Sequence, residues 1–156
     1  MPQQNRIQSY IEDGGGSVFV ALDEDKVVGT AAYRVQIGTE WYRRGKYAYI
    51  CFGSVLPAYT GMGVLRAMNK ERDKSIENHG LSTSYFDTNI RNARRISIAR
   101  KEGYRLVDVE YYRDHYSVRL AKWASVGHSS IYCHFHFVVA MVKASIKRIV
   151  SVFRGE

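Results

Sequence analysis

The segment SVLPAYTGMGVLRAM, at residues 54–68, constrains the fold of this chain more than any other. An apolar strand pattern ends there at Pro57, and the closely spaced Gly61 and Gly63 precede apolar residues at helical spacing. Glycine lets a ligand approach the backbone closely, and the free N–H groups of a first helical turn attract phosphate. The segment therefore predicts a strand, a glycine turn and a helix, either as a phosphate site or as a tight turn without a ligand.

Apolar alternation and turn residues predict further strands on both sides of this unit. The expected helices cover residues 3–12, about 61–79 and 89–103, and the expected strands cover 17–22, 26–36, 47–55, 81–88, 104–112 and 115–123. The first two and the last two strands are typical of antiparallel hairpins, whereas the unit at 47–88 has the strand–helix–strand order of a parallel pair. The expected fold is therefore α/β (α+β), a mixed, mostly antiparallel sheet with a central parallel strand pair and flanking helices.

The composition is that of an ordinary globular domain, since 46% of the 156 residues are hydrophobic and 24% are charged. The net charge of +8 fits a nucleic acid, an anionic membrane or a polyanionic cofactor as partner, and equally a solvated basic surface. Nucleic acid is the least favoured of these because the sequence has no helix-turn-helix, zinc or RNP pattern.

The two cysteines, Cys51 and Cys133, lie far apart and lack metal-ligand spacing, so no metal site is expected. Sparse, unpaired cysteines are typical of reduced compartments. The N-terminal residues lack the apolar stretch of a signal peptide. The sequence therefore predicts a cytoplasmic protein.

A second segment, DTNIRNARRISIARKEGY at residues 87–104, has the pattern of a basic amphipathic helix closed by a glycine. In this order and spacing the two segments resemble the pyrophosphate-binding motif and the later helix of the GNAT acetyltransferases. The resemblance covers roughly residues 15–123 and includes the strand order. The matching positions are Val55, Pro57 and Gly63 in the first segment, and Asn92, Gly103 and Tyr104 in the second.

The resemblance implies an enzyme that moves an acetyl group from acetyl-CoA to an acceptor, most simply the amine of a small molecule, an amino sugar or a protein. It implies that backbone amides hold the pyrophosphate, that the main chain of a strand end pairs with the pantetheine arm, and that an asparagine bonds the same arm. The implied cofactor-binding residues are Ser54, Val55, Gly61, Met62, Gly63, Val64, Leu65 and Asn92. A helix N-cap is the alternative role of Asn92. A non-catalytic CoA-binding or interaction module is the alternative function.

Three residues depart from the family pattern. Thr60 stands where the family usually has Gln or Arg, and Leu65 stands where it has Gly or Ala. Ala99 replaces the tyrosine that often protonates the departing thiolate, so the acid of the reaction is unassigned. The short stretch before the first hairpin also suggests that an edge of the fold is truncated or supplied by another segment or partner.

Acetylation of an amine needs a base, or a water path, that takes a proton from the ammonium group. Glu40, in the polar loop before the third strand, is the first candidate. Tyr49 occupies a strand position where some relatives place a carboxylate, and Asp87 ends the fourth strand. Each of the three has a structural role as its alternative.

Residues 124–156 are expected to form a separate C-terminal segment after a domain at 1–123, with a basic amphipathic helix over 129–154. Helical spacing puts its large apolar residues on one face and its basic residues opposite. The apolar set is Ile131, Phe135, Val138, Val142, Ile149 and Phe153, and the polar set is His136, Lys143, Lys147 and Arg154. Three partners for this helix are open: the bare edge of its own domain, a second copy in a homodimer, or an anionic membrane surface. A membrane span is disfavoured because charges interrupt the apolar run.

Overall fold

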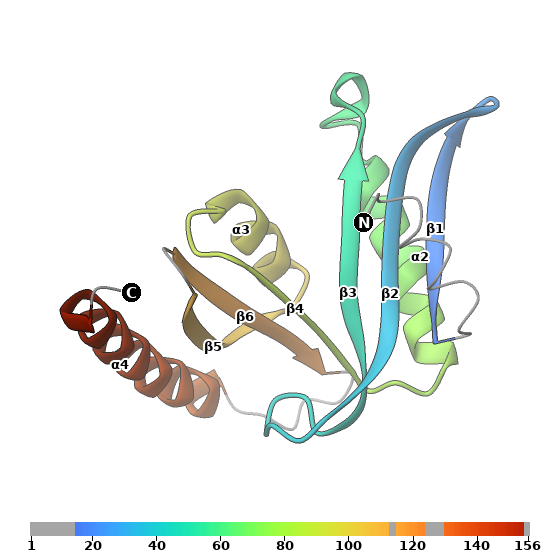
Figure 1. Ribbon diagram of the computed structural model, residues 1–156. Coiled ribbons are helices and arrows are strands. Elements are labelled where there is room, and N and C mark those ends of the chain that lie inside the picture. Colours follow the sequence, from blue (N-terminus) through green and yellow to red (C-terminus); the bar gives the residue numbers. More distant parts are fainter. Residues whose placement is uncertain (1–14, 113–114, 124–129, 155–156) are drawn as a thin grey trace. The chain divides into compact units, whose positions relative to one another are not determined.

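The computed structural model describes residues 15–112, 115–123 and 130–154, apart from side chains at both ends of the last helix (Figure 1). Its six strands follow the order β1-β2-β3-β4-β6-β5 along a mostly antiparallel sheet with one parallel pair. This architecture confirms the expected fold class. The helix expected at residues 3–12 lies outside the described residues. The chain divides after Ser84 into two compact units.

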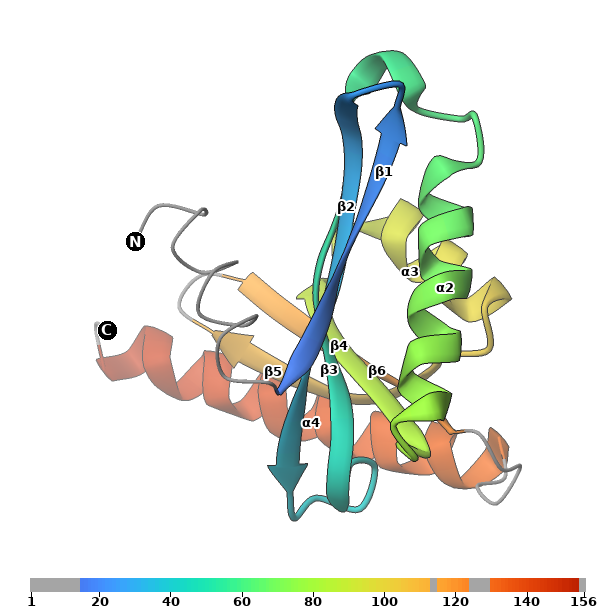
Figure 2. The ribbon, with the colours of Figure 1, turned by 90° about the vertical axis from the view of Figure 1, so that its right-hand side faces the viewer.

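The first unit holds the strands β1 (Gly16–Asp23), β2 (Lys26–Gly38) and β3 (Gly45–Val55), and the helix α2 (Val64–Asn78). The three strands are paired in antiparallel fashion, and α2 packs against all of them (Figure 2). Met68 and Ile76 place the apolar face of α2 in the core. Gly29 lets the helix approach closely, since a Cβ there would lie 2.8 Å from the Met68 methyl group.

The second unit holds most of β4 (Thr83–Asn89), α3 (Ala93–Lys101), β5 (Arg105–Tyr112), β6 (His115–Trp123) and α4 (Ser130–Arg154). β5 and β6 form the antiparallel hairpin that the sequence predicted. Its core is built from the valines and leucines of alternate positions and from Tyr104, whose ring meets that of Phe86 edge-on at 5.2 Å. The third helix begins at Ala93 rather than at residue 89, because Asn89 and Asn92 bond the backbone ahead of them.

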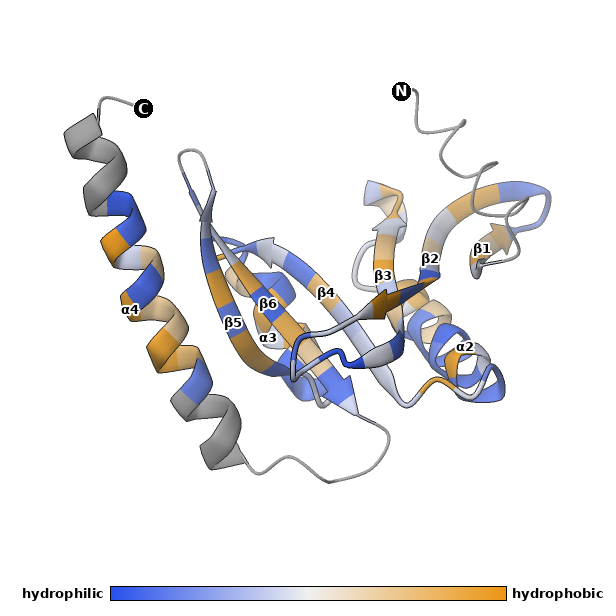
Figure 3. Ribbon diagram, turned by 60° about the horizontal axis from the view of Figure 1, so that its bottom comes forward, coloured by the Kyte–Doolittle hydropathy of each residue, from blue (hydrophilic) through white to orange (hydrophobic). Residues whose placement is uncertain are grey.

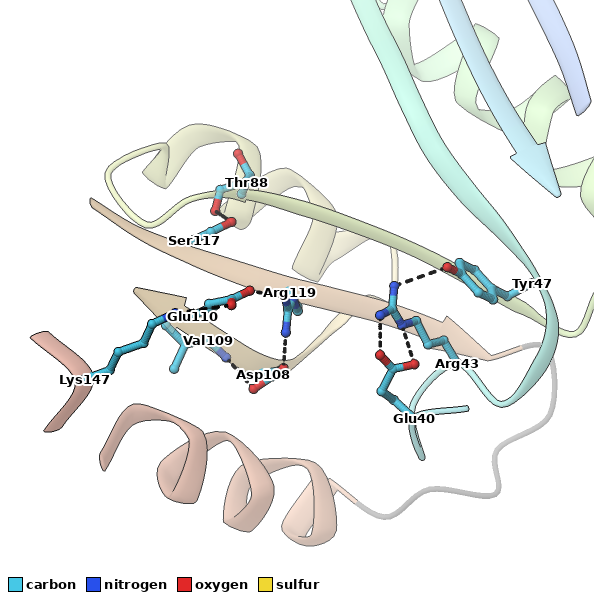
Figure 4. A network of polar contacts seen from close by, with 10 residues as sticks. All are labelled: Glu40, Arg43, Tyr47, Thr88, Asp108, Val109, Glu110, Ser117, Arg119 and Lys147. Carbon is cyan, nitrogen blue, oxygen red and sulfur yellow. Dashed lines mark hydrogen bonds and ion pairs between the residues drawn. The ribbon is translucent and has the colours of Figure 1, made fainter. Parts of the chain in front are cut away.

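A polar network on the second unit links its last three elements (Figure 4). Arg119 of β6 bonds two carboxylates of β5, Asp108 at 2.5 Å and Glu110. Glu110 in turn faces Lys147 of α4 at 3.7 Å. The network therefore lies between one side of α4 and β5.

α4 packs against β5 through small side chains. Ala140 and Ala144 are buried, with 9% and 4% of their surface exposed, whereas Val138 and Val142 are 46% and 55% exposed. Of the three partners left open for the face with Val138 and Val142, the strand β5 of the same chain is not the one that covers these two residues. A hydrophobic pattern shows that a helix is amphipathic, but small residues and ion pairs decide which side meets the sheet.

Candidate functional site

The N-terminus of α2 is the part of the first unit best suited to hold an anion. The chain leaves β3 through a short 3-10 helix, Pro57–Tyr59, in which Thr60 N donates to Pro57 O at 3.1 Å. Gly61 and Gly63 then follow with φ of 87° and 83°, in the left-handed region that favours glycine. Gly63 is the N-cap residue, so no side chain caps the helix, and no acidic residue lies in its first turn.

This geometry leaves backbone donors exposed. The first N–H groups of any helix have no acceptor within it, and here no capping oxygen takes their place. A Cβ added at either glycine would meet nothing within 4 Å, so the space beside the turn is open. The partial positive charge of the helix N-terminus points into that space. Phosphate oxygens are the groups that such a turn binds best.

The glycine turn is fastened to the β1–β2 hairpin. The Tyr59 hydroxyl donates a hydrogen bond to Asp23 Oδ2 at 2.5 Å, and this contact raises the pKa of Tyr59 above its usual value. Asp23 is the last residue of β1, immediately before the hairpin turn. This bond had no signal in the sequence, because the two residues are far apart in the chain and Asp23 belongs to no recognisable motif.

The end of β3 carries an irregularity that the sequence analysis also missed. Ala32 of β2 pairs with Phe52, but the next residue, Tyr33, pairs with Ile50, so Cys51 is the extra residue of a β-bulge. Beyond the bulge, Ser54 pairs with Thr30, and their hydroxyl oxygens lie 3.0 Å apart. Bulges bend a strand and often lie next to active sites, and this one precedes the stretch predicted to pair with pantetheine.

Asn92 is the N-cap of α3. Its Oδ1 accepts a hydrogen bond from Arg95 N at 3.2 Å, and its Nδ2 donates to Thr88 Oγ1 at 3.4 Å. The structure therefore gives Asn92 the capping role that was the alternative in the sequence analysis. One hydrogen of the Nδ2 group remains for a ligand, since an amide nitrogen carries two.

Glu40 is engaged in an ion pair rather than poised as a base (Figure 4). Arg43 bonds both carboxylate oxygens, with its Nε donating at 2.9 Å to Oε2 and an Nη donating to Oε1. The hydrogen bond from Arg43 lowers the pKa of Glu40 to about 2. A carboxylate held in this way is a weak proton acceptor at neutral pH.

The two other candidate bases lie in different surroundings. Tyr49 is half-buried on β3, with the Arg34 guanidinium carbon 5.2 Å from its ring centroid. Asp87 is exposed on β4. Among the described residues, no group of His, Cys, Asp and Glu side chains could hold a metal ion.

A family model of the GNAT acetyltransferases matches residues 2–104. The chain belongs to this family. Its members are acyltransferases, and the glycine turn at the start of α2 lies within the matched region. No match was found among curated protein sequences.

Solved GNAT structures share the fold. An alanine N-acetyltransferase of ribosomal protein S18 from Escherichia coli has a TM-score of 0.61 and 18% identity, over 80% of this chain and 81% of its own. A GNAT family acetyltransferase from Elizabethkingia anophelis with acetyl-CoA bound has a TM-score of 0.60 and 12% sequence identity, and the match covers 78% of this chain and 84% of that protein. An IAA acetyltransferase from Bacillus cereus has a TM-score of 0.59 and 16% sequence identity, and the match covers 78% of this chain and 85% of that protein.

Ala99 stands at the position of α3 where the GNAT pattern often has tyrosine, and it is buried, with 2% of its surface exposed. Tyr104 N donates to Ala99 O at 3.0 Å as the chain leaves the helix. Because Ala99 is buried, a phenol ring in place of its methyl group would have to displace its neighbours. Any acid that serves the thiolate must therefore come from another residue or from water.

Proposed function

We propose that the chain transfers the acetyl group of acetyl-CoA to an amine of a small molecule, an amino sugar or a protein. Membership of the GNAT family supports acetyl transfer in general. The observation that carries the proposal is the start of α2, where Gly63 leaves the helix without a capping side chain and opens its first amides to an anion. One structural relative has acetyl-CoA bound, and another is an alanine N-acetyltransferase.

In this proposal the backbone amides of Gly61, Gly63, Val64 and Leu65 hold the pyrophosphate, whereas Met62 N donates to Tyr59 O at 3.4 Å within the turn. The main chain of Ser54 and Val55 pairs with the pantetheine arm as an added strand would, and the remaining Nδ2 hydrogen of Asn92 bonds the same arm. Acetyl-CoA supplies an activated thioester whose acyl carbon the acceptor amine attacks. Leu65 adds bulk where the family usually has Gly or Ala, and in this proposal it contributes its backbone N–H.

The acceptor must lose a proton before it can attack, and the chain offers two candidates once Glu40 is committed to Arg43. Asp87 is exposed on β4, so its carboxylate can pass a proton to water. Tyr49 is half-buried on β3, with the Arg34 guanidinium carbon 5.2 Å from the centroid of its ring. We propose Asp87 as the base and Tyr49 as its alternative.

A non-catalytic CoA-binding module is the second candidate. Two observations favour it: the position of the usual acid is filled by the buried Ala99, and the first candidate base is engaged in an ion pair. The two candidates differ in turnover but share coenzyme binding.

Release of free CoA thiol from acetyl-CoA, measured with a panel of amines, decides between them. An acetyltransferase releases thiol only when an acceptor is present, with stoichiometric acetylation of that acceptor by mass spectrometry. Binding of acetyl-CoA in a calorimeter without acceptor-dependent thiol release across amino acids, polyamines, amino sugars and peptide N-termini supports the module. Absence of acetyl-CoA binding contradicts both.

A further inference from the structure

Helix α4 presents its large apolar residues to solvent. Val138, Val142 and Ile146 are 46%, 55% and 55% exposed, and residues four positions apart lie on the same face of a helix, so the three form one stripe. Figure 3 shows hydrophobic residues along α4. The side that packs on β5 is instead lined by the buried Ala140 and Ala144. The helix therefore exposes its large apolar side chains, whose burial would release the most free energy, and buries its small ones.

Two polar contacts lie on the packed side of α4, next to the buried alanines. Lys147 lies 3.7 Å from the Glu110 carboxylate, and the Arg148 guanidinium carbon lies 5.8 Å from the centroid of the Tyr116 ring. The buried alanines and these contacts lie on the side of α4 that meets β5, so the stripe lies on the side away from the sheet. Single exposed apolar residues are ordinary on protein surfaces, but a contiguous stripe marks a binding surface.

The charge of the helix indicates which partner covers the stripe. Residues 130–154 carry Lys143, Lys147, Arg148 and Arg154 and no acidic residue, within a chain of net charge +8. Lys143 is exposed one position beyond Val142 in the chain. Two copies of this helix packed along the stripe would form no ion pair between the helices, because residues 130–154 contain no acidic residue.

An anionic lipid surface is complementary to both the apolar stripe and the positive charge of the helix. The acyl chains accept apolar side chains, and the headgroups attract lysine and arginine at the edge of the polar region. Among the described residues, no helix is long and apolar enough to cross a membrane. A helix of this kind lies in the plane of the interface.

We propose that α4 binds anionic membranes by lying flat on them, with Val138, Val142 and Ile146 buried in the lipid and Lys143 at the headgroups. This inference does not depend on the acetyl acceptor or on the coenzyme site.

The test uses the full chain and co-sedimentation with vesicles of phosphatidylcholine alone or with about one third phosphatidylglycerol. We expect binding to the anionic vesicles only, and weaker binding as salt rises. Val142→Glu is expected to lower the affinity at least tenfold, because it places a charge in the lipid and repels the headgroups. Lys143→Glu is expected to lower it several-fold. Ile37→Glu is the matched control, since Ile37 is 77% exposed on β2 and belongs to the other unit. It should leave vesicle binding unchanged.

Insertion of the stripe is tested separately with Val142→Trp. Its fluorescence emission, corrected for Trp41 and Trp123 in the parent chain, is expected to shift to the blue when anionic vesicles are added. This variant keeps an apolar residue at the exposed position, so it decides the question even if Val142→Glu does not fold.

Three results would overturn the proposal. The first is failure of the parent chain to bind anionic vesicles at low salt, and the second is an unshifted Val142→Trp emission with vesicles bound. The third is a dimer, detected by light scattering, that Val142→Glu dissociates while vesicle binding is unaffected. That result assigns the stripe to a second copy.

Discussion

Tyr59 and Asp23 tie the glycine turn before α2 to the tip of the β1–β2 hairpin through one hydrogen bond of 2.5 Å. Tyr59→Phe should therefore loosen the turn and raise the dissociation constant of acetyl-CoA by about two- to tenfold. Calorimetry on Tyr59→Phe, Asp23→Asn and the double variant measures the effect. In a double-mutant cycle the losses should not add, because both single changes remove the same bond. Additive losses would show that the bond does not support the site.

The hydrogen bond between Tyr59 and Asp23 should break when the Tyr59 hydroxyl ionises at high pH. Its phenol donates only while protonated, and Asp23 raises the pKa of Tyr59 above the ordinary value of 10.0. The stabilisation is therefore present at neutral pH and is lost only as the pH rises through the raised pKa. Ultraviolet titration should show one tyrosine of the parent chain that ionises later than in Asp23→Asn.

Gly63→Glu should abolish acetyl-CoA binding, because the new carboxylate occupies the open space at the start of α2 and repels the pyrophosphate. Gly80→Glu is the matched control. Gly80 has a φ of 68°, no atom within 4 Å of an added Cβ, and a position just past the other end of the same helix. Both variants add one charge and comparable backbone strain, so binding in a calorimeter separates the anion site from general damage. Equal affinity of the two variants for acetyl-CoA would show that the pyrophosphate does not bind at the start of α2.

Glu40→Gln should leave acetyl transfer within about tenfold of the parent, since a general base contributes about 10²–10⁴-fold and Glu40 is held by Arg43. Acceptor-dependent thiol release measures this effect. Asp87→Asn is the comparison, and there we expect the larger loss. A loss with Glu40→Gln that exceeds the loss with Asp87→Asn would restore Glu40 as the base.

Protonation of Glu40 should lower the stability of the fold slightly at acid pH. Its pKa is lowered from 4.5 to about 2, so the ion pair stabilises the fold above pH 4.5 and loses that contribution as the pH falls toward 2. The carboxylate side chain is 40% exposed, which limits the contribution to at most about 1 kcal/mol. Melting temperatures of the parent and of Glu40→Gln should differ slightly at pH 7 and converge near pH 2. A constant difference would exclude this titration as the cause.

Ala99→Tyr should destabilise the protein, although tyrosine is the residue that the family pattern suggests. Ala99 is buried, and overpacking of a filled core costs about 1–3 kcal/mol or more. Thermal melting measures the loss, with Ser97→Tyr as the control because Ser97 is exposed on the same helix. A stable Ala99→Tyr with faster acetyl transfer would show that the helix can accept the missing acid.

The elements of this fold could be predicted because each has a local signal. Strand alternation located the hairpins, and the proline and glycines located the start of α2 within a few residues. The bulge at Cys51 had no such signal, since strand register depends on the neighbouring strand rather than on the bulged residues. The Glu40–Arg43 pair was visible as an opposite charge three residues away, but its geometry depends on the loop. The base and the acetyl acceptor stay predictions.

The alanine side of α4 has a consequence for how the chain could have acquired its last helix. Burial of two alanine methyl groups, an exposed ion pair between Lys147 and Glu110 and an exposed arginine over the Tyr116 ring each contribute little to the free energy of unfolding. A helix attached so lightly can be gained, lost or exchanged in evolution without any change in the strands beneath it. The same property makes α4 portable: fused behind an unrelated reporter protein, it is expected to bring that protein to anionic membranes.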